Sequence, residues 1–112
     1  MAKTDTNHQS TPTVAVSKQA AKGLKLREEH GRGGTLVGLH RGKQLRHREP
    51  IDVATLKKMR SYFARHNVDK RGKNWANPDK PSAGYIAWLL WGGDEGRDWC
   101  EKELAKLERQ SR

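Results

Sequence analysis

Hydrophobic positions recur at spacings of three and four along much of the chain, a pattern that predicts helices. The clearest stripe lies in residues 53–66, where basic side chains occupy the other faces. Its apolar members are Val53, Leu56, Met59, Tyr62 and Phe63. Asp52 precedes the stripe and is a favourable N-cap, because its carboxylate can accept from a free amide of the first turn. We therefore expect a helix over residues 53–66 with one buried face.

Weaker patterns predict two helices before this one. Ser17 is a plausible cap for a helix over residues 17–30, and Gly31 is a natural stop for it. Thr35 can cap the next helix, over residues 36–47, which carries three leucines along one side. Both segments are short and amphipathic, so we expect each to pack one face on the rest of the domain.

Residues 83–91 are the most apolar segment of the chain and have almost no polar face. A helix that is apolar on all sides is buried, so we expect this one, capped by Ser82, at the centre of the core. Asp94 can cap a last helix that runs to about Arg109. Strand signals are weak throughout. The predicted class is all-α, a small single domain of four to five short helices.

Two polar stretches predict irregular structure. Residues 1–16 are rich in Thr, Ser, Asn and Gln, and contain too few large apolar groups to offset their ordering entropy. We expect a flexible N-terminal arm there and a basic helical domain over residues 17–112. Residues 67–80 predict a long loop, which in a small domain is often functional. Trp75 lies within it and is expected to anchor the loop to the core.

Composition narrows the class of protein further. The chain has 112 residues, of which 33% are hydrophobic, so the core must be small. It lacks a run of about 18 apolar residues that would predict a transmembrane helix. Residues 1–15 lack the layout of a secretion signal. Cys100 is the single cysteine, which excludes an internal disulfide and a cysteine-based zinc site. A basic, soluble protein of a reducing compartment is the expectation.

The positive charge is concentrated in one part of the sequence. The formal net charge is +10, and residues 22–73 hold 15 Lys and Arg against five acidic residues. This asymmetry favours a face that contacts polyanions, although a solvated basic surface is the alternative. Lys and Arg bind phosphates with release of counterions. The candidate polyanion-binding residues are Arg32, Arg41, Lys43, Arg46, Arg48, Lys57, Lys58, Arg60, Arg65, Lys70, Arg71 and Lys73.

The glycine-rich segment 31–35 has two interpretations. Its exposed amides, next to Arg32 and before a helix, could cradle a phosphate. The spacing of its glycines matches neither the Walker pattern nor the dinucleotide fingerprint. The alternative is a tight turn between helices that requires positive φ angles.

No complete catalytic or metal motif is present. Four histidines of the central region lack the i, i+4 spacing and the carboxylate cluster of a metal site: His30, His40, His47 and His66. His66 with Asp69, or Cys100 with a distant histidine, would lack the third group that orients a base. We therefore expect no enzyme activity, no metal and no cofactor. Trp88 and Trp91 are expected in the core rather than in a ligand site.

Five ordered strings resemble a known family when they are taken as a set. They are GRGGT at 31–35, SYFARH at 61–66, DK at 69–70, PSAG at 81–84 and IAWLLWGGD at 86–94. Together they resemble a small helical domain family of tailed-phage proteins, associated with head and structural gene cassettes. The similarity spans residues 20–102. The resemblance implies a phage protein of the virion head or its assembly, and it implies no catalytic residue.

The expected function is that of a non-enzymatic virion structural or head-assembly accessory protein, capsid-associated, that grips neighbouring subunits through its arm and basic face. Its expected partners are capsid or other virion proteins in an assembly of many copies, with no membrane. Its expected location is the phage virion, and the host cytoplasm during assembly. The alternative is a non-specific nucleic-acid-binding protein that contacts DNA or RNA through phosphates. An intracellular protein that inhibits a nucleic-acid-handling enzyme of the host is a third hypothesis.

Overall fold

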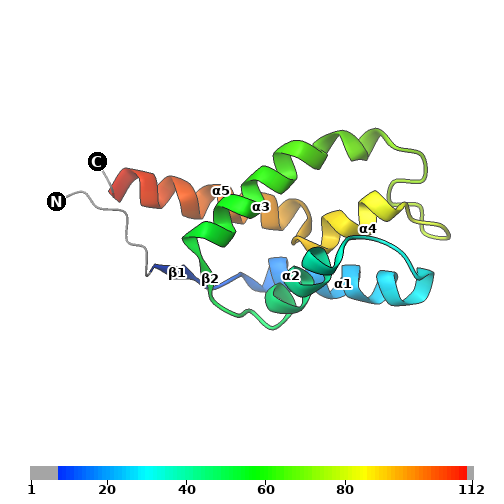
Figure 1. The fold of residues 1–112 in the computed structure, drawn as a ribbon, viewed down its shortest axis with the longest axis horizontal. Helices are drawn as coiled ribbons and strands as arrows, with labels where there is room; N and C mark the ends of the chain where they lie inside the picture. The colour runs from blue at the N-terminus through cyan, green and yellow to red at the C-terminus, as the bar shows by residue number, and fades with distance from the viewer. Residues whose placement is uncertain (1–7, 111–112) are drawn as a thin grey trace.

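Five α-helices and one short antiparallel ribbon form the part of the chain that the structure, a computed structural model, describes, residues 8–110 (Figure 1). The helices are α1 (Val14–His30), α2 (Leu36–Arg46), α3 (Val53–His66), α4 (Ala83–Leu90) and α5 (Gly93–Gln110). The ribbon pairs β1 (Gln9–Ser10) with β2 (Ile51–Asp52). The all-α expectation is confirmed. No helix among these residues is long and apolar enough to cross a bilayer.

The helices α2, α3 and α4 begin where the capping residues predict. The side chains of Thr35, Asp52 and Ser82 each accept a hydrogen bond from the amide three residues further on, at 3.2, 2.8 and 3.1 Å. Each such cap stabilises its helix by about 1 kcal/mol. Gly31 ends α1 as predicted: it has a φ of 62°, and its amide donates to the carbonyl oxygen of Arg27.

The start of α1 corrects the prediction. Its cap is Thr13, whose hydroxyl accepts from the amide of Val16 at 3.2 Å, rather than Ser17. Ser17 lies inside the helix, and its hydroxyl donates to the carbonyl oxygen of Arg46 at 2.6 Å. The helix begins earlier because Val16 is completely buried in the core. Burial of this side chain compensates for the ordering of a segment that is polar on average.

The predicted arm over residues 1–16 is therefore too long. Residues 1–7 lie outside the described residues, but Gln9 and Ser10 pair with β2, and Ser10 is only 4% exposed. A second correction concerns Asp94, which was expected to cap the last helix. Asp94 lies in the first turn of α5, and its carboxylate accepts from the side chains of Lys70 and Trp88.

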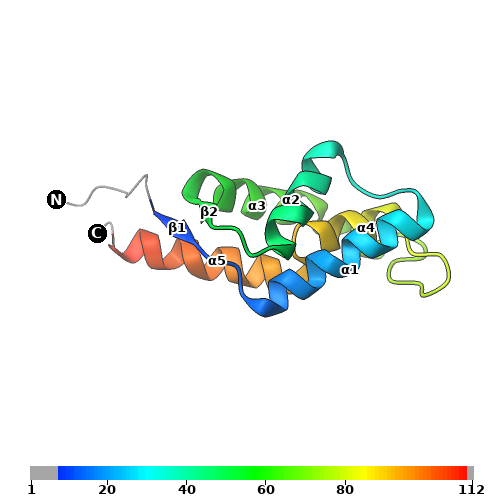
Figure 2. The same ribbon diagram turned by 90° about the horizontal axis from the view of Figure 1, so that it is seen from below.

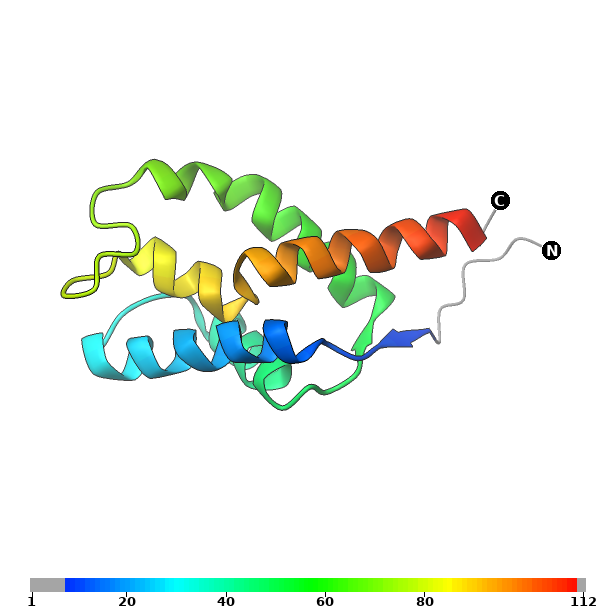
Figure 3. The same ribbon diagram turned by 180° about the vertical axis from the view of Figure 1, so that it is seen from behind.

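The core lies where the amphipathic helices enclose α4. Helix α1 packs against α2 and α4, and α3 packs against α5. Figure 2 shows α1 alongside α4, and Figure 3 shows α3 crossing α5. Ile86, Trp88 and Leu90 of α4 are at most 1% exposed, which confirms the predicted central position of this helix. Gly92 and Gly93, with φ angles of 110° and 65°, make the sharp turn from α4 into α5.

The polar segment after α3 is more ordered than predicted. Residues Asn67–Arg71 form a 3-10 helix that extends α3, and only the remainder is irregular. Trp75 anchors that remainder, as expected, with its ring edge-on to Tyr85 at 5.1 Å and to Trp88 at 5.9 Å. Lys70 adds a bond to the carboxylate of Asp94 at 2.7 Å. These contacts hold the segment against α4 and α5.

Candidate binding groove

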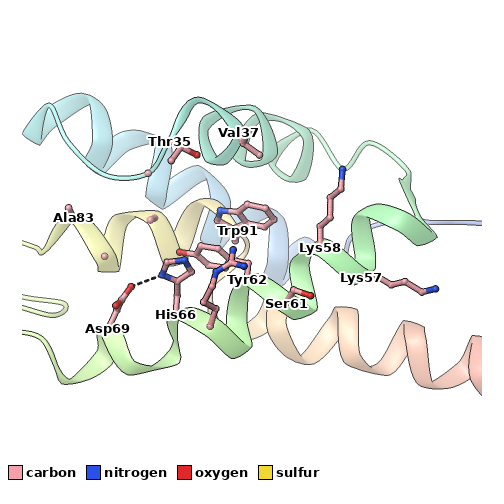
Figure 4. Close-up of a pocket in the computed structure, with 14 residues that line it drawn as sticks. Thr35, Val37, Lys57, Lys58, Ser61, Tyr62, His66, Asp69, Ala83 and Trp91 are labelled. Atoms are coloured by element: carbon pink, nitrogen blue, oxygen red, sulfur yellow. Dashed lines mark hydrogen bonds and ion pairs between the residues drawn. The ribbon is translucent and has the colours of Figure 1, made fainter.

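A groove of about 730 Å³ lies between the start of α2, one face of α3 and the helix α4 (Figure 4). This volume falls within the range of ligand sites, which is about 300–1,000 Å³. Most of its lining is apolar. The groove is open along one side, so its shape suits an elongated partner as well as a small molecule. We call this site the α2–α3–α4 groove.

Helix α3 supplies the polar face of the groove. Lys58, Tyr62, Arg65, His66 and Asp69 all line it, and each lies three or four residues from another member of the set. Residues at these spacings lie on the same side of a helix. The first four belong to α3, and the 3-10 helix that continues α3 carries Asp69. The same helix buries its other apolar positions in the core, so the polar stripe is held in a defined orientation.

A series of stacked side chains forms the floor of the groove and joins three helices. The rings of Tyr62 and Trp91 are nearly parallel, with centroids 4.5 Å apart and an interplanar angle of 7°. Tyr62 also stacks on His66 at 4.5 Å, and the guanidinium of Arg41 lies 5.3 Å from the centroid of the Trp91 ring. Such stacked contacts add to the energy of burial. The floor is therefore a rigid part of the core.

The hydroxyl group of Tyr62 is buried at the side of this stack. It has no hydrogen-bond partner among the described residues. Burial raises the pKa of Tyr62 strongly, and the charge of Asp69 raises it further, whereas Arg65 acts in the opposite direction. The hydroxyl therefore stays protonated. A buried polar group without a partner destabilises the fold. The hydroxyl of Tyr62, at the side of the groove, is therefore expected to lower the stability of the protein.

His66 and Asp69 form a pair that the sequence analysis set aside. The Nδ1 atom of His66 lies 3.0 Å from an oxygen of Asp69, and both side chains are more than one third exposed. The 3-10 helix that follows α3 brings Asp69 to the Nδ1 edge of the His66 ring, and the spacing of three residues was the available signal in the sequence. No hydroxyl or thiol among residues 8–110 bonds to His66. A His–Asp pair activates a nucleophile when one is hydrogen-bonded to the histidine, and no such bond to His66 occurs among the described residues.

The rim of the groove is positively charged. Lys58 and Arg65 are exposed, and neither forms an ion pair among the described residues, although the charge of Lys58 interacts with that of Asp52. Figure 4 shows the side chains of Lys57 and Lys58 leaving α3 in different directions, and both residues line the groove. The one carboxylate that lines the groove belongs to Asp69 and is engaged by His66. The charge of the rim is therefore at most partly compensated, which favours an anionic partner.

The opposite wall carries exposed apolar side chains. Leu36 and Val37, in the first turn of α2, are 79% and 56% exposed, and Val37 lines the groove. The α4 wall presents the small residues Ala83, Gly84 and Ala87. Apolar side chains gathered beside a groove are typical of a docking site.

Arg41 corrects the predicted set of polyanion-binding residues. It is 6% exposed, and its guanidinium donates to the side-chain oxygen of Gln44 in addition to its contact with Trp91. Desolvation lowers the pKa of its guanidinium, and the charge of Asp52 opposes that effect. Arg41 therefore stabilises the packing of α2 on α4 and is not accessible to a polyanion. The pattern of residue types along a helix does not distinguish a buried basic residue from an exposed one.

The other eleven candidates fall into two groups. Arg32 and Arg48 donate to proline carbonyl oxygens at 2.8 and 2.7 Å, and Arg60 and Lys70 form ion pairs with carboxylates of α5 at 3.2 and 2.7 Å. The remaining seven are exposed and have no ion pair among the described residues: Lys43, Arg46, Lys57, Lys58, Arg65, Arg71 and Lys73. Of these seven, only Lys57, Lys58 and Arg65 line the groove.

The glycine-rich segment has the geometry of the tight turn. Gly31, Gly33 and Gly34 have φ angles of 62°, 108° and 76°. A Cβ atom at Gly33 would lie 2.4 Å from Ile86, so the segment also packs closely on α4. The Arg32 side chain bonds to the backbone of another segment. These contacts account for the glycines without a bound phosphate, and Gly34 additionally forms part of the groove.

The remaining candidate chemistry is buried or dispersed. Burial raises the pKa of the Cys100 thiol to about 12, and that thiol donates to the carbonyl oxygen of Arg97 at 3.3 Å. A thiol of this kind is a poor nucleophile at neutral pH. Within residues 8–110, no three His, Cys, Asp or Glu side chains come together as a possible metal site.

The strings that carry the phage resemblance surround the α2–α3–α4 groove. Of the residues that line it, only Val37, Lys57 and Lys58 lie outside those strings. Sequence reasoning treated the strings as separate helix starts and turns, and it missed that the fold brings them to one place. No family model matches this chain, and no curated protein and no solved structure matches it significantly.

Proposed function

We propose that this protein is a non-enzymatic binding protein that holds an anionic partner in the α2–α3–α4 groove, and that it works as an accessory protein of phage head assembly. The observation that carries the proposal is the pair Lys58 and Arg65, which form no ion pair among the described residues and line a largely apolar groove. Cations that form no ion pair and lie beside apolar surface favour the binding of a partner that supplies both carboxylates and apolar side chains.

The phage context rests on the sequence resemblance. The strings behind that resemblance line the groove, so a shared use of the groove would account for the residues at which the similarity concentrates. No hydroxyl or thiol of the described residues bonds to His66, so the proposal assigns no catalytic role to the His66–Asp69 pair.

The experiment is a comparison of purified particles and assembly intermediates of the phage that encodes the protein. Quantitative mass spectrometry should find the wild-type protein in at least one of them, in many copies. The double variant Lys58→Glu/Arg65→Glu should be depleted, whereas the matched variant Lys43→Glu/Lys73→Glu, which changes the same charge outside the groove, should be retained. A protein that is absent from particles and intermediates alike would contradict the assembly role.

A second function is supported by a different observation. Four of the predicted polyanion-binding residues are exposed, form no ion pair among the described residues and lie outside the groove, on α2 and in the segment after α3: Lys43, Arg46, Arg71 and Lys73. These residues could contact phosphates of a nucleic acid without sequence specificity. A gel-shift series over increasing salt tests this alternative. It requires binding to duplex DNA at low salt that weakens steeply as salt rises, and the variant Lys43→Glu/Lys73→Glu should weaken it.

A further inference from the structure

We infer that the occupant of the α2–α3–α4 groove is an amphipathic helix of a partner protein, with acidic residues along one edge of its apolar face. The inference rests on the proposed function, because it names the partner of that same groove. Three features of the groove carry it: the exposed apolar side chain of Val37 in its α2 wall, the small residues of its α4 wall and the spacing of its two rim cations.

The apolar wall requires an apolar partner. Leu36 and Val37 are among the few large hydrophobic side chains that the described residues leave exposed. Across from them, Ala83, Gly84 and Ala87 make a low wall without long side chains. Small residues at helical spacing allow a second helix to approach closely, and its larger side chains can fill the space above them. Burial of this surface stabilises the complex by roughly 25 cal/mol for each Å² of apolar area.

The cations define where the acidic groups of the partner lie. Lys58 and Arg65 are seven residues apart on α3, so they lie on one face, separated by roughly 10.5 Å along the helix axis. A docked helix that runs alongside α3 presents residues seven positions apart at the same separation. The partner therefore carries Asp or Glu at two positions seven residues apart, beside an i, i+3, i+4, i+7 apolar stripe.

A nucleic acid fits this groove less well. Non-specific binders of single strands present aromatic faces on which bases stack. Here the rings of Tyr62 and Trp91 are 6% and 8% exposed and stack on each other. The phosphates of a duplex would also leave Val37, which lines the groove, and its exposed neighbour Leu36 without a complementary apolar surface. Charge and apolar surface together favour a protein helix.

The test uses the full-length protein and labelled synthetic peptides of about 18 residues, or five helical turns. One peptide has Leu at the stripe positions and Glu at two positions seven apart on its edge. The second has the same composition in an order that disperses the stripe. Fluorescence anisotropy should show saturable binding of the first peptide and at least about tenfold weaker binding of the second.

Variants locate the bound peptide. Lys58→Glu/Arg65→Glu and, separately, Val37→Asp should each weaken binding of the first peptide by at least about tenfold. Lys43→Glu/Lys73→Glu should leave it within about twofold. All three changes are at exposed positions, and far-UV circular dichroism with thermal unfolding verifies that each variant is folded.

The outcomes separate this inference from the proposed function. Equal binding of both peptides, or binding that ignores the groove variants, overturns the amphipathic helix. The amphipathic helix is also overturned if a 20-bp DNA duplex binds through Lys58 and Arg65 and the peptides do not. In that case the proposal that the groove holds an anionic partner still stands. Self-association of the protein that requires Lys58 and Arg65 would make a second copy the occupant. If the Lys58→Glu/Arg65→Glu variant is depleted from phage particles but the wild-type protein does not bind the peptide, the amphipathic helix is refuted and the proposed function stands.

Discussion

The ring of Tyr62 lies almost parallel to the ring of Trp91, with centroids 4.5 Å apart and an angle of 7° between the planes. Tyr62 comes from α3 and Trp91 immediately follows α4, so the contact fixes these helices against each other. Arg41 of α2 and His66 of α3 extend the same series of contacts. The groove is thus built on packed core side chains, which makes its shape independent of any partner.

Tyr62→Phe should leave the stability unchanged or raise it by up to about 1 kcal/mol. The substitution keeps the stack and removes a buried hydroxyl that has no partner among the described residues. Tyr62→Leu, which removes the stack, should instead destabilise the protein by about 1–3 kcal/mol. Urea unfolding followed by circular dichroism measures both changes. A loss of more than 1 kcal/mol in the phenylalanine variant would mean that the hydroxyl has a partner.

Trp88→Ala should destabilise the fold by about 3–5 kcal/mol, because the ring is 1% exposed and its loss leaves a large cavity. The indole also contacts Phe63 edge-on at 4.8 Å and donates to Asp94 at 2.9 Å. Trp88→Phe retains much of the volume and should lose less. Thermal unfolding of the two variants gives the comparison. An alanine variant as stable as the wild type would place this ring outside the core.

Gly23→Ala should destabilise the protein, although alanine is favoured over glycine in helix interiors by about 1 kcal/mol. A Cβ atom at Gly23 would lie 2.8 Å from the backbone nitrogen of Leu90 and 2.9 Å from the Cβ of Leu89. Helices α1 and α4 would have to separate. The exposed position Lys25 in the same helix serves as the control, since Lys25→Ala should be nearly neutral. The free energies of unfolding of the two variants decide the question.

Acidification should destabilise the protein partly through Asp94. Burial alone would raise the pKa of this carboxyl, but hydrogen bonds from Lys70 and Trp88 and the nearby charges of Lys70 and Arg97 lower it below its ordinary value of 3.8. The folded state therefore binds the proton less tightly than the unfolded state. The resulting stability is present above about pH 4 and is lost as the pH falls through the lowered pKa.

Asp94→Asn removes this dependence. The melting temperature of the variant should fall less steeply than that of the wild type below about pH 4. Near pH 7 the variant should be the less stable of the two, because it loses the charged bond to Lys70. Parallel melting curves of the two proteins from pH 2 to pH 7 provide the measurement, and identical slopes at low pH would argue against a role for Asp94.

The thiol of Cys100 should resist alkylation while the protein is folded. Burial raises its pKa to about 12, so almost no thiolate exists at pH 8. The side chain is also inaccessible. Mass spectrometry after iodoacetamide treatment should find the native protein unmodified and the urea-unfolded protein fully modified. Rapid modification of the folded protein would show that α5 opens locally.

Much of the helical structure was predictable because its signals are local. The apolar stripe over residues 53–66 repeats at the helical period, and the capping residue Asp52 directly precedes it. Helix α3 accordingly has the predicted bounds. The start of α1 was not predictable, because it depends on the burial of Val16 against distant helices. The accessibility of Arg41 to a polyanion was predicted wrongly for the same reason. Its position on α2 resembles that of an exposed arginine until α4 covers it.

The sequence alone determined the class of fold, three of the helix caps, the central position of α4 and the concentration of positive charge. Each of these depends on residue type and short-range spacing, which the sequence displays directly. Only the tertiary structure decided which basic residues are free, and it alone placed Lys58 and Arg65 opposite Val37 across a groove. The physical reason is that the groove, and the cations beside it that form no ion pair, arise from the packing of helices that are far apart in the chain. Local sequence patterns do not contain information about that packing.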